Sequence, residues 1–244
     1  MPTPALDTLP GFRRRILVTP GEHWVRAEVE DDYHCMSVTV RHDGKTATEI
    51  VPVMDRAPWT TCPGAPARLI ETFTGAALED FAMRGQKKTN CTHLHDMAVL
   101  AAAHAHDAAP SVYDILVSDP TEDGLHHAEI RRDGETLLRW AHKDFRFVEP
   151  ASLAGIMLTD MNAWIAELPK ALKEPARMLR WGTMMANGRT LPMERQSDAS
   201  RMPPTCYTFQ PERAVQAKRV GKIMDFSGGA AEPLTESRAR LVQD

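Results

Sequence analysis

A thiol, two imidazoles and a carboxylate occur within one short segment, at Cys91, His93, His95 and Asp96. The Ala-Val-Leu-Ala-Ala-Ala run that follows them predicts that they occupy the first turns of a helix. Polar groups buried at the start of a helix need partners, because an unpaired buried polar group costs free energy. This segment is therefore the first candidate for a functional site.

Helical geometry divides these four side chains into two flanks. Residues three or four apart are neighbours on a helix, whereas residues two apart are not. Cys91 and His95 are therefore expected on one flank, and His93 and Asp96 on another. A regular helix cannot bring His93 and His95 onto one metal ion. We expect His93 and Asp96 to take part in chemistry.

Cys91 has two interpretations. With Thr89 or Asn90 as the N-cap, Cys91 would lie at the positive end of the helix. Unpaired backbone N–H groups there, together with Lys87 and Lys88, would favour its thiolate. The alternative is an inert thiol that shapes a pocket, since free cysteine is one of the most commonly buried residues.

A second reactive stretch, Asp-Asp-Tyr-His-Cys at 31 to 35, precedes a predicted strand. An aspartate close to His34 can orient the imidazole and raise its basicity, as a general base near neutral pH requires. Strand alternation places His34 opposite Cys35, on the same face as the apolar Val38, so His34 is expected to point inward. The alternative for the two aspartates is a polar turn.

A third stretch, residues 56–65, is rich in turn-forming residues and carries Arg56, Trp59 and Cys62. A guanidinium suits a carboxylate or phenolate, and an indole suits a planar ring. This loop is therefore a candidate for binding an aromatic ligand. The alternative is that Arg56 binds carbonyl oxygens of the loop and Trp59 fills the core.

The remaining histidines and cysteines give weaker signals. A two-residue turn at Asp133-Gly134 would pair His127 with position 140 and His126 with position 141, which brings both histidines close to His142. Histidines on a hairpin surface are common, however. The four cysteines, at 35, 62, 91 and 206, contain no CxxC pair and are expected to be free thiols. Dispersed ligands such as Cys62, Cys91, Cys206 and His93 could still assemble a metal site.

The elements that must position these residues follow from periodicity and turn signals. Strands are predicted at 15–19, 24–30, 34–41 and 46–54, and again at 111–118, 128–132 and 135–142. Asp43-Gly44 and Asp133-Gly134 favour two-residue hairpin turns. The two hairpins indicate either a duplicated unit or two wings of one sheet, and we favour the second. Helices are predicted at 66–73, 78–84, 91–106, 160–168 and 175–187.

These elements predict an α+β fold, with a mostly antiparallel sheet of two β-hairpin units packed against helices, including a buried helix that begins near Cys91. One domain is expected over residues 1–227. It would comprise a hairpin unit at 12–56, a helical middle at 63–106, a hairpin unit at 111–148 and helices at 160–187. Gly, Pro, Glu and Ser dominate from 228 onward, so 228–244 is expected to be a flexible tail.

Composition excludes several classes of protein. The 244 residues are 43% hydrophobic and 25% charged, which is typical of a globular protein. A net charge of -4 argues against a nucleic-acid partner. The sequence has neither a signal peptide nor about 18 consecutive apolar residues, so a cytoplasmic protein without a membrane partner is expected. These features are also compatible with a homodimer.

Three strings together resemble a known family: Asp-Asp-Tyr-His at 31 to 34, Arg-Ala-Pro-Trp-Thr-Thr-Cys-Pro-Gly-Ala at 56 to 65, and Asn-Cys-Thr-His-Leu-His-Asp at 90 to 96. Their order and spacing are similar to the bacterial domain-of-unknown-function family 2889, over about residues 10–110. The resemblance implies a lyase that releases formaldehyde from lignin-derived phenolic compounds. It nominates the following site residues: Asp32, His34, Arg56, Trp59, Cys62, Cys91, His93 and Asp96.

The sequence therefore predicts a cofactor-independent carbon–carbon lyase that acts on a small aromatic substrate by acid–base catalysis. His93, His34, Arg56 and Asp32 are the expected catalytic residues. Substrate binding is expected from Trp59, Tyr33, Cys62, Cys91 and Asp96, and no metal is expected. The alternatives are a protein that binds a metal through Cys and His, with or without catalysis, and a non-catalytic protein that binds an aromatic ligand.

Overall fold

The computed structural model describes residues 5–190, 197–229 and 231–242. The fold is α+β, as predicted, and its antiparallel strands follow the order β4-β3-β2-β1-β5-β6-β7-β8. The chain forms two compact parts. The β5–β8 part comprises Met1–Arg15, Val112–Leu191 and Asp225–Glu232, and the β2–β4 part comprises Ile16–Ser111, Pro192–Met224 and Pro233–Asp244.

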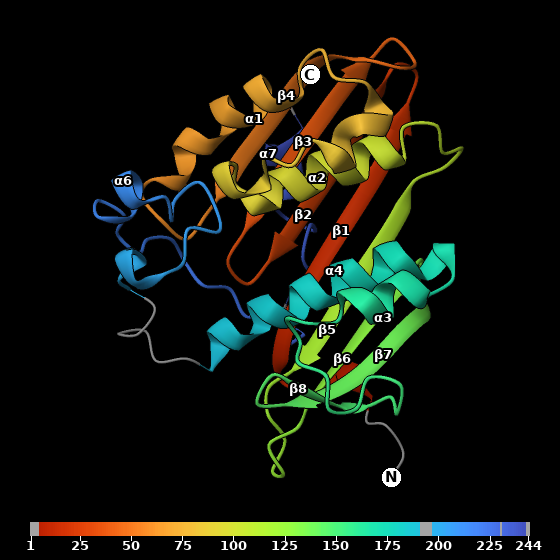
Figure 1. The fold of residues 1–244 in the computed structure, drawn as a ribbon, viewed down its shortest axis with the longest axis vertical. Helices are drawn as coiled ribbons and strands as arrows, with labels where there is room; N and C mark the ends of the chain where they lie inside the picture. The colour runs from red at the N-terminus through yellow and green to blue at the C-terminus, as the bar shows by residue number, and fades with distance from the viewer. Residues whose placement is uncertain (1–4, 191–196, 230, 243–244) are drawn as a thin grey trace. The chain divides into compact units, whose positions relative to one another are not determined.

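The β2–β4 part contains all the sequence-predicted site residues. Its strands are the second half of β1 (Gly11–Gly21), β2 (Trp24–Asp31), β3 (Cys35–His42) and β4 (Ala47–Arg56). Helix α1 (Ala65–Phe73) packs on β4, and α2 (Thr92–Ala103) packs across β2 and β3 (Figure 1). Short 3-10 turns at Leu78–Met83 and Lys87–Thr89 connect the two helices.

Helix α2 is the buried helix that the sequence predicted. Small residues such as Ala98 and Ala101 are fully buried, which allows a close approach to the strands. The N-cap is Cys91 itself, which has an extended backbone, rather than Thr89 or Asn90. The first turn therefore begins one or two residues later than expected, and it holds His93 at the buried side of the helix.

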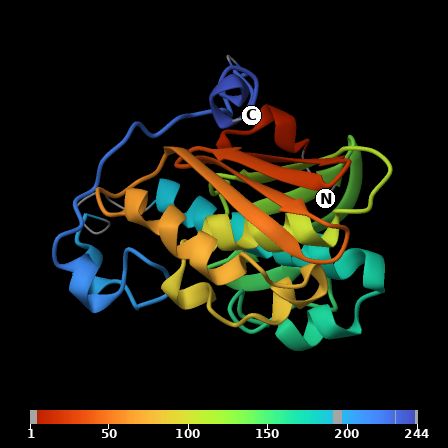
Figure 2. The same cartoon turned by 90° about the horizontal axis from the view of Figure 1, so that it is seen from above.

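The C-terminal segment covers the other face of β3 and β4. Leu234 and Leu241 are buried in a cluster with Cys35 and Val53, and α7 (Arg238–Leu241) lies on the opposite side of the strands from α1 and α2 (Figure 2). Part of the segment that the sequence predicted as a flexible tail therefore packs on the strands, and positions 230, 243 and 244 of that prediction lie outside the described residues. Composition suggested mobility, but burial of two leucines fixes the segment.

The two predicted hairpin turns have different outcomes. Asp133 and Gly134 have φ angles of 52° and 87° and form the expected two-residue turn, for which positive φ is required. At the β3–β4 turn, His42 instead pairs with Ala47, so the loop has four residues. The Asp43 carboxylate accepts hydrogen bonds from backbone N–H groups of this loop and stabilises the longer turn.

The β5–β8 part contains the first half of β1 and strands β5 (Ser111–Ser118), β6 (His126–Arg132), β7 (Glu135–Lys143) and β8 (Arg146–Glu149). Helix α4 (Lys170–Ala186) packs on β6 and β7, next to the shorter α3 (Asn162–Glu167). The sequence did not predict β8. Helix α4 begins at Lys170 rather than at Pro175, so Pro175 lies inside the helix. No helix within the described ranges is long and apolar enough to cross a membrane.

A histidine pair lies within the second hairpin. A register shift after Ile130 pairs His126 with His142 and His127 with Ala141, one position from the expected pairing. The rings of His126 and His142 stack with centroids 4.9 Å apart. Burial, with a smaller contribution from the neighbouring histidines, lowers the pKa of His142 to about 4.

This lowered pKa predicts a loss of stability in mild acid. The unfolded chain binds a proton at His142 near pH 6.5, whereas the folded protein does so only near pH 4, so stability falls as the pH decreases between these values. We expect His142→Phe to remove about 2 kcal/mol of the difference in unfolding free energy between pH 7 and pH 5. Urea unfolding at both pH values measures this, with His127→Phe as the control. An unchanged difference in His142→Phe would contradict the assignment.

Candidate functional site

Three buried groups of the β2–β4 part come together at one place. One ligand atom from each of Asp31, His34 and His93 lies within 4.8 Å of the other two. The two imidazole rings stack with centroids 3.7 Å apart and an interplanar angle of 26°. Asp31 is fully buried, and both histidines are 6% exposed. Among the described residues, only this trio of His, Cys, Asp or Glu side chains has such close ligand atoms.

Asp31 fixes the position of His34 at the turn between β2 and β3. The Asp31 Oδ1 atom accepts hydrogen bonds from the backbone N–H groups of Tyr33 and His34, both at 2.8 Å. The same oxygen lies 3.0 Å from Nδ1 of His34. With Asp31 ionised, its carboxylate can only accept hydrogen bonds, and Nδ1 of His34 would then carry the proton and leave Nε2 as the basic atom.

The aspartate that orients His34 is therefore Asp31 rather than the predicted Asp32. Asp32 is also fully buried. Its backbone carbonyl accepts hydrogen bonds from Arg56 Nη1 and from the backbone N–H of Met224, both at 2.8 Å. Sequence alone could not separate two adjacent aspartates, because only the turn conformation decides which carboxylate reaches the imidazole.

Arg56 holds this turn from the end of β4. Its Nη2 atom donates to the Asp31 carbonyl at 2.8 Å and to the Glu30 carboxylate at 3.0 Å. The His34 carbonyl is a further acceptor at 3.3 Å. Arg56 therefore binds backbone carbonyl oxygens of the β2–β3 turn rather than those of its own loop, which makes it a positioning residue for Asp31 and His34.

His93 lies next to Asp31 and His34 because α2 packs across β2 and β3. Asp96, expected to act with His93, instead forms an ion pair with Lys87 at 2.5 Å and is not one of the three clustered groups. His95 lies against the Phe73 ring, with centroids 5.1 Å apart. The predicted separation of His93 and His95 around the helix is confirmed, but the carboxylate beside the histidine pair comes from the β2–β3 turn.

The thiols are not activated. Burial raises the pKa of Cys91 to about 12, an effect larger than that of the nearby helix N–H groups, which favours the inert thiol over the thiolate. Burial also raises the pKa values of Cys62 and Cys206. Cys62 lies 3.3 Å from the Thr208 hydroxyl. The described residues include no group of clustered metal ligands that contains a cysteine.

The aromatic residues near the trio are largely covered. Trp59 is 5% exposed and packs with Cys62 and Ala214, with its ring edge-on to Phe209. The Tyr33 ring lies edge-on to His34, with centroids 6.2 Å apart. Trp59 therefore fills a small core, as in the alternative that assigned it a packing role. Tyr33, in contrast, contacts the histidine pair directly.

Sequence reasoning missed one residue of this region, Arg219. Its guanidinium lies 5.5 Å from the Tyr33 ring centroid and 5.4 Å from that of Trp59. Arg219 follows a lysine in a stretch without helical or strand periodicity, so no local signal distinguished it. Its position depends on backbone pairing with the loop that holds Trp59.

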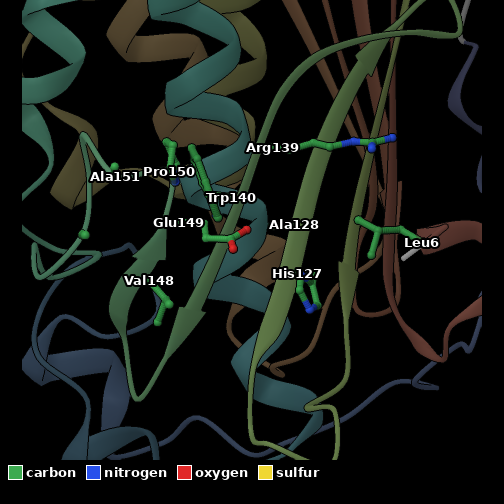
Figure 3. A pocket seen from close by; sticks show the side chains of 10 residues that line it. Leu6, His127, Ala128, Arg139, Trp140, Val148, Glu149, Pro150 and Ala151 are labelled. Atoms are coloured by element: carbon green, nitrogen blue, oxygen red, sulfur yellow. The ribbon is translucent and has the colours of Figure 1, made fainter. Parts of the chain in front are cut away.

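A cavity of about 520 Å³ lies elsewhere, in the β5–β8 part (Figure 3). Its apolar walls include Leu6, Trp140 and Val148, and none of the predicted site residues lines it. Arg139 also lines it, but its guanidinium is paired with the buried Glu129 carboxylate at 2.5 Å. The cavity therefore lacks the clustered reactive groups of the Asp31, His34 and His93 trio.

Neither a protein-family model nor a curated protein matches the chain. The resemblance to family 2889 therefore remains a prediction from the three sequence strings.

Proposed function

We propose that the protein is an enzyme in which His34 and His93 act as an acid–base pair oriented by Asp31. The observation that carries this proposal is the stacked pair of buried imidazoles, 3.7 Å apart, with a carboxylate on Nδ1 of one ring. Two imidazolium ions in contact would repel each other. The pair is therefore suited to hold one extra proton, which provides one base and one acid.

The proposed reaction is a carbon–carbon cleavage that releases formaldehyde from a primary alcohol on a small phenolic substrate. Nε2 of His34 removes the hydroxyl proton, and the oxygen electron pair forms the carbonyl bond of formaldehyde. The electron pair of the broken carbon–carbon bond remains on the substrate, which takes a proton from His93. The reaction is redox-neutral, since an alcohol R–CH2OH yields R–H and formaldehyde.

A different reaction class for the same site is a metal-assisted one. Two imidazoles and one carboxylate form a donor set that suits iron, zinc or related ions. The observation in favour is that one ligand atom from each group lies within 4.8 Å of the others. Asp31 Oδ1 already accepts two backbone hydrogen bonds and faces His34, so its carboxylate is better placed to orient an imidazole than to bind an ion.

The two candidates differ in their response to chelation. We expect the purified protein to release formaldehyde from phenolic substrates that carry a primary alcohol, at a rate unchanged after treatment with EDTA and dialysis. Formaldehyde is measured colorimetrically, and elemental analysis gives the metal content before and after treatment. Stoichiometric zinc or iron, with activity lost on removal and restored by adding the ion, would favour the metal-assisted enzyme. Absence of formaldehyde across the substrate series would contradict the lyase.

A further inference from the structure

Arg219 is held beside the proposed catalytic pair by a short antiparallel pairing. The backbone N–H of Thr60 donates to the Lys218 carbonyl at 3.0 Å, and that of Val220 donates to the Pro58 carbonyl at 2.9 Å. These bonds place Arg219 directly across from Trp59. The position of the Arg219 backbone is therefore fixed by the loop rather than by contacts of its own side chain.

The charge of the Arg219 side chain is not paired with any carboxylate in the part of the chain that the structure describes. Its guanidinium contacts the faces of the Tyr33 and Trp59 rings, and it has no hydrogen-bond acceptor or carboxylate partner among the residues that the structure describes. Burial lowers the pKa of Arg219 below its usual value. By contrast, Arg213 lies over the Tyr207 ring but is also paired with Glu212.

Cation–π contacts use the faces of the rings and leave the N–H groups of a guanidinium without acceptors. These donors form a planar fork that matches the two oxygens of a carboxylate. Arg219 is half-buried, and partial removal of a guanidinium from water without a partner is unfavourable, so binding of an anion would lower the free energy of the site. Ring contacts on Arg219 also restrict its side chain before any ligand arrives, which lowers the entropic cost of binding.

Tyr33 connects Arg219 with the histidine pair. Its ring contacts the Arg219 guanidinium and also lies edge-on to His34, which stacks on His93. A ligand anchored at Arg219 would therefore have its remaining atoms near the proposed base. This separation of a binding group from the reacting atoms is what substrate positioning requires.

We propose that Arg219 binds a carboxylate of the substrate, so that the enzyme acts on aromatic carboxylic acids. This inference rests on the proposed function, which supplies the aromatic ring, and Arg219 adds the carboxylate. A purely structural Arg219 would stabilise the loop through its two ring contacts but would not distinguish an anionic ligand from a neutral one of the same shape.

Equilibrium binding of 4-hydroxybenzoate and the neutral 4-hydroxybenzamide tests this distinction. We expect the wild-type protein to bind the acid more tightly than the amide. Arg219→Gln is expected to weaken binding of the acid by about 10-fold or more, with less than about 2-fold change for the amide. Arg213→Gln is the matched control, because it also removes an arginine from the face of an aromatic ring, and should change neither affinity.

Arg219→Lys keeps the charge but loses the planar fork, so it should weaken binding of the acid less than Arg219→Gln does. It also provides a test if the glutamine variant does not fold. Wild-type protein that binds both compounds equally or neither of them, or an acid affinity unchanged in both Arg219 variants, would overturn the inference. Selective binding of the acid without formaldehyde release in any substrate would refute only the proposed lyase.

Discussion

His34→Gln is expected to lower turnover in the formaldehyde assay by about 100-fold or more, because the variant lacks the Nε2 base. Glutamine has a similar reach and retains polarity, so it limits the disturbance of a side chain that is only 6% exposed. His93→Gln should have an effect of similar size, since the reaction needs both an acid and a base. Steady-state kinetics with one phenolic substrate measure both variants.

His104 provides a matched control for this experiment. His104 lies at the end of α2, and its Nδ1 atom is 2.6 Å from the Asp107 carboxylate. The two residues are three positions apart in the sequence, as are Asp31 and His34. His104→Gln should leave turnover within about 2-fold of the wild type, because it removes a histidine outside the site. Normal turnover in both His34→Gln and His93→Gln would exclude the acid–base mechanism, provided that thermal unfolding shows folded protein.

Arg56→Met is expected to lower the free energy of unfolding by about 3 kcal/mol. The Arg56 side chain is 14% exposed, and its partner Glu30 is 7% exposed, so the variant leaves a buried carboxylate without its cation. The carbonyl groups of Asp31 and Asp32 also lose a donor. The loss of stability should lie at the lower end of the range for a broken buried ion pair, since Ser237 still donates a hydrogen bond to the Glu30 carboxylate.

Urea unfolding measures this loss, and Arg68→Met is the control. Arg68 forms an exposed ion pair with Glu71, and such pairs contribute less than about 1 kcal/mol. Because Arg56 positions the turn, turnover of folded Arg56→Met should also fall, whereas Arg68→Met should retain normal activity. A stability loss in Arg56→Met equal to that in Arg68→Met would show that the turn does not depend on this guanidinium.

Local physical signals were sufficient for most of the elements. The alternation of apolar residues predicted the strands, and the small-residue run after Asp96 predicted the buried helix. Asp133-Gly134 predicted its turn because two consecutive residues with positive φ require such a sequence. The same reasoning did not hold at Asp43-Gly44, where the aspartate side chain stabilises a longer loop through its own hydrogen bonds.

Tertiary contacts decided the features that local signals left open. The flexible tail was expected from composition, but Leu234 and Leu241 find a hydrophobic surface on β3 and β4 that is distant in sequence. For Cys91 the sequence left two interpretations, a thiolate favoured by the helix start and an inert thiol. Burial favours the inert thiol, because the cost of desolvating a charge depends on the surroundings that the fold supplies.

For the candidate site, the sequence by itself determined which segments carry chemistry: the turn before β3 and the first turn of α2. Only the tertiary structure decided that His34 meets His93, that Asp31 rather than Asp32 orients the pair, and that Arg219 lies over Tyr33. The physical reason is the range of the interactions. Periodicity and turn preferences act over a few residues, whereas His34, His93 and Arg219 are brought together by packing between segments that are far apart in the chain.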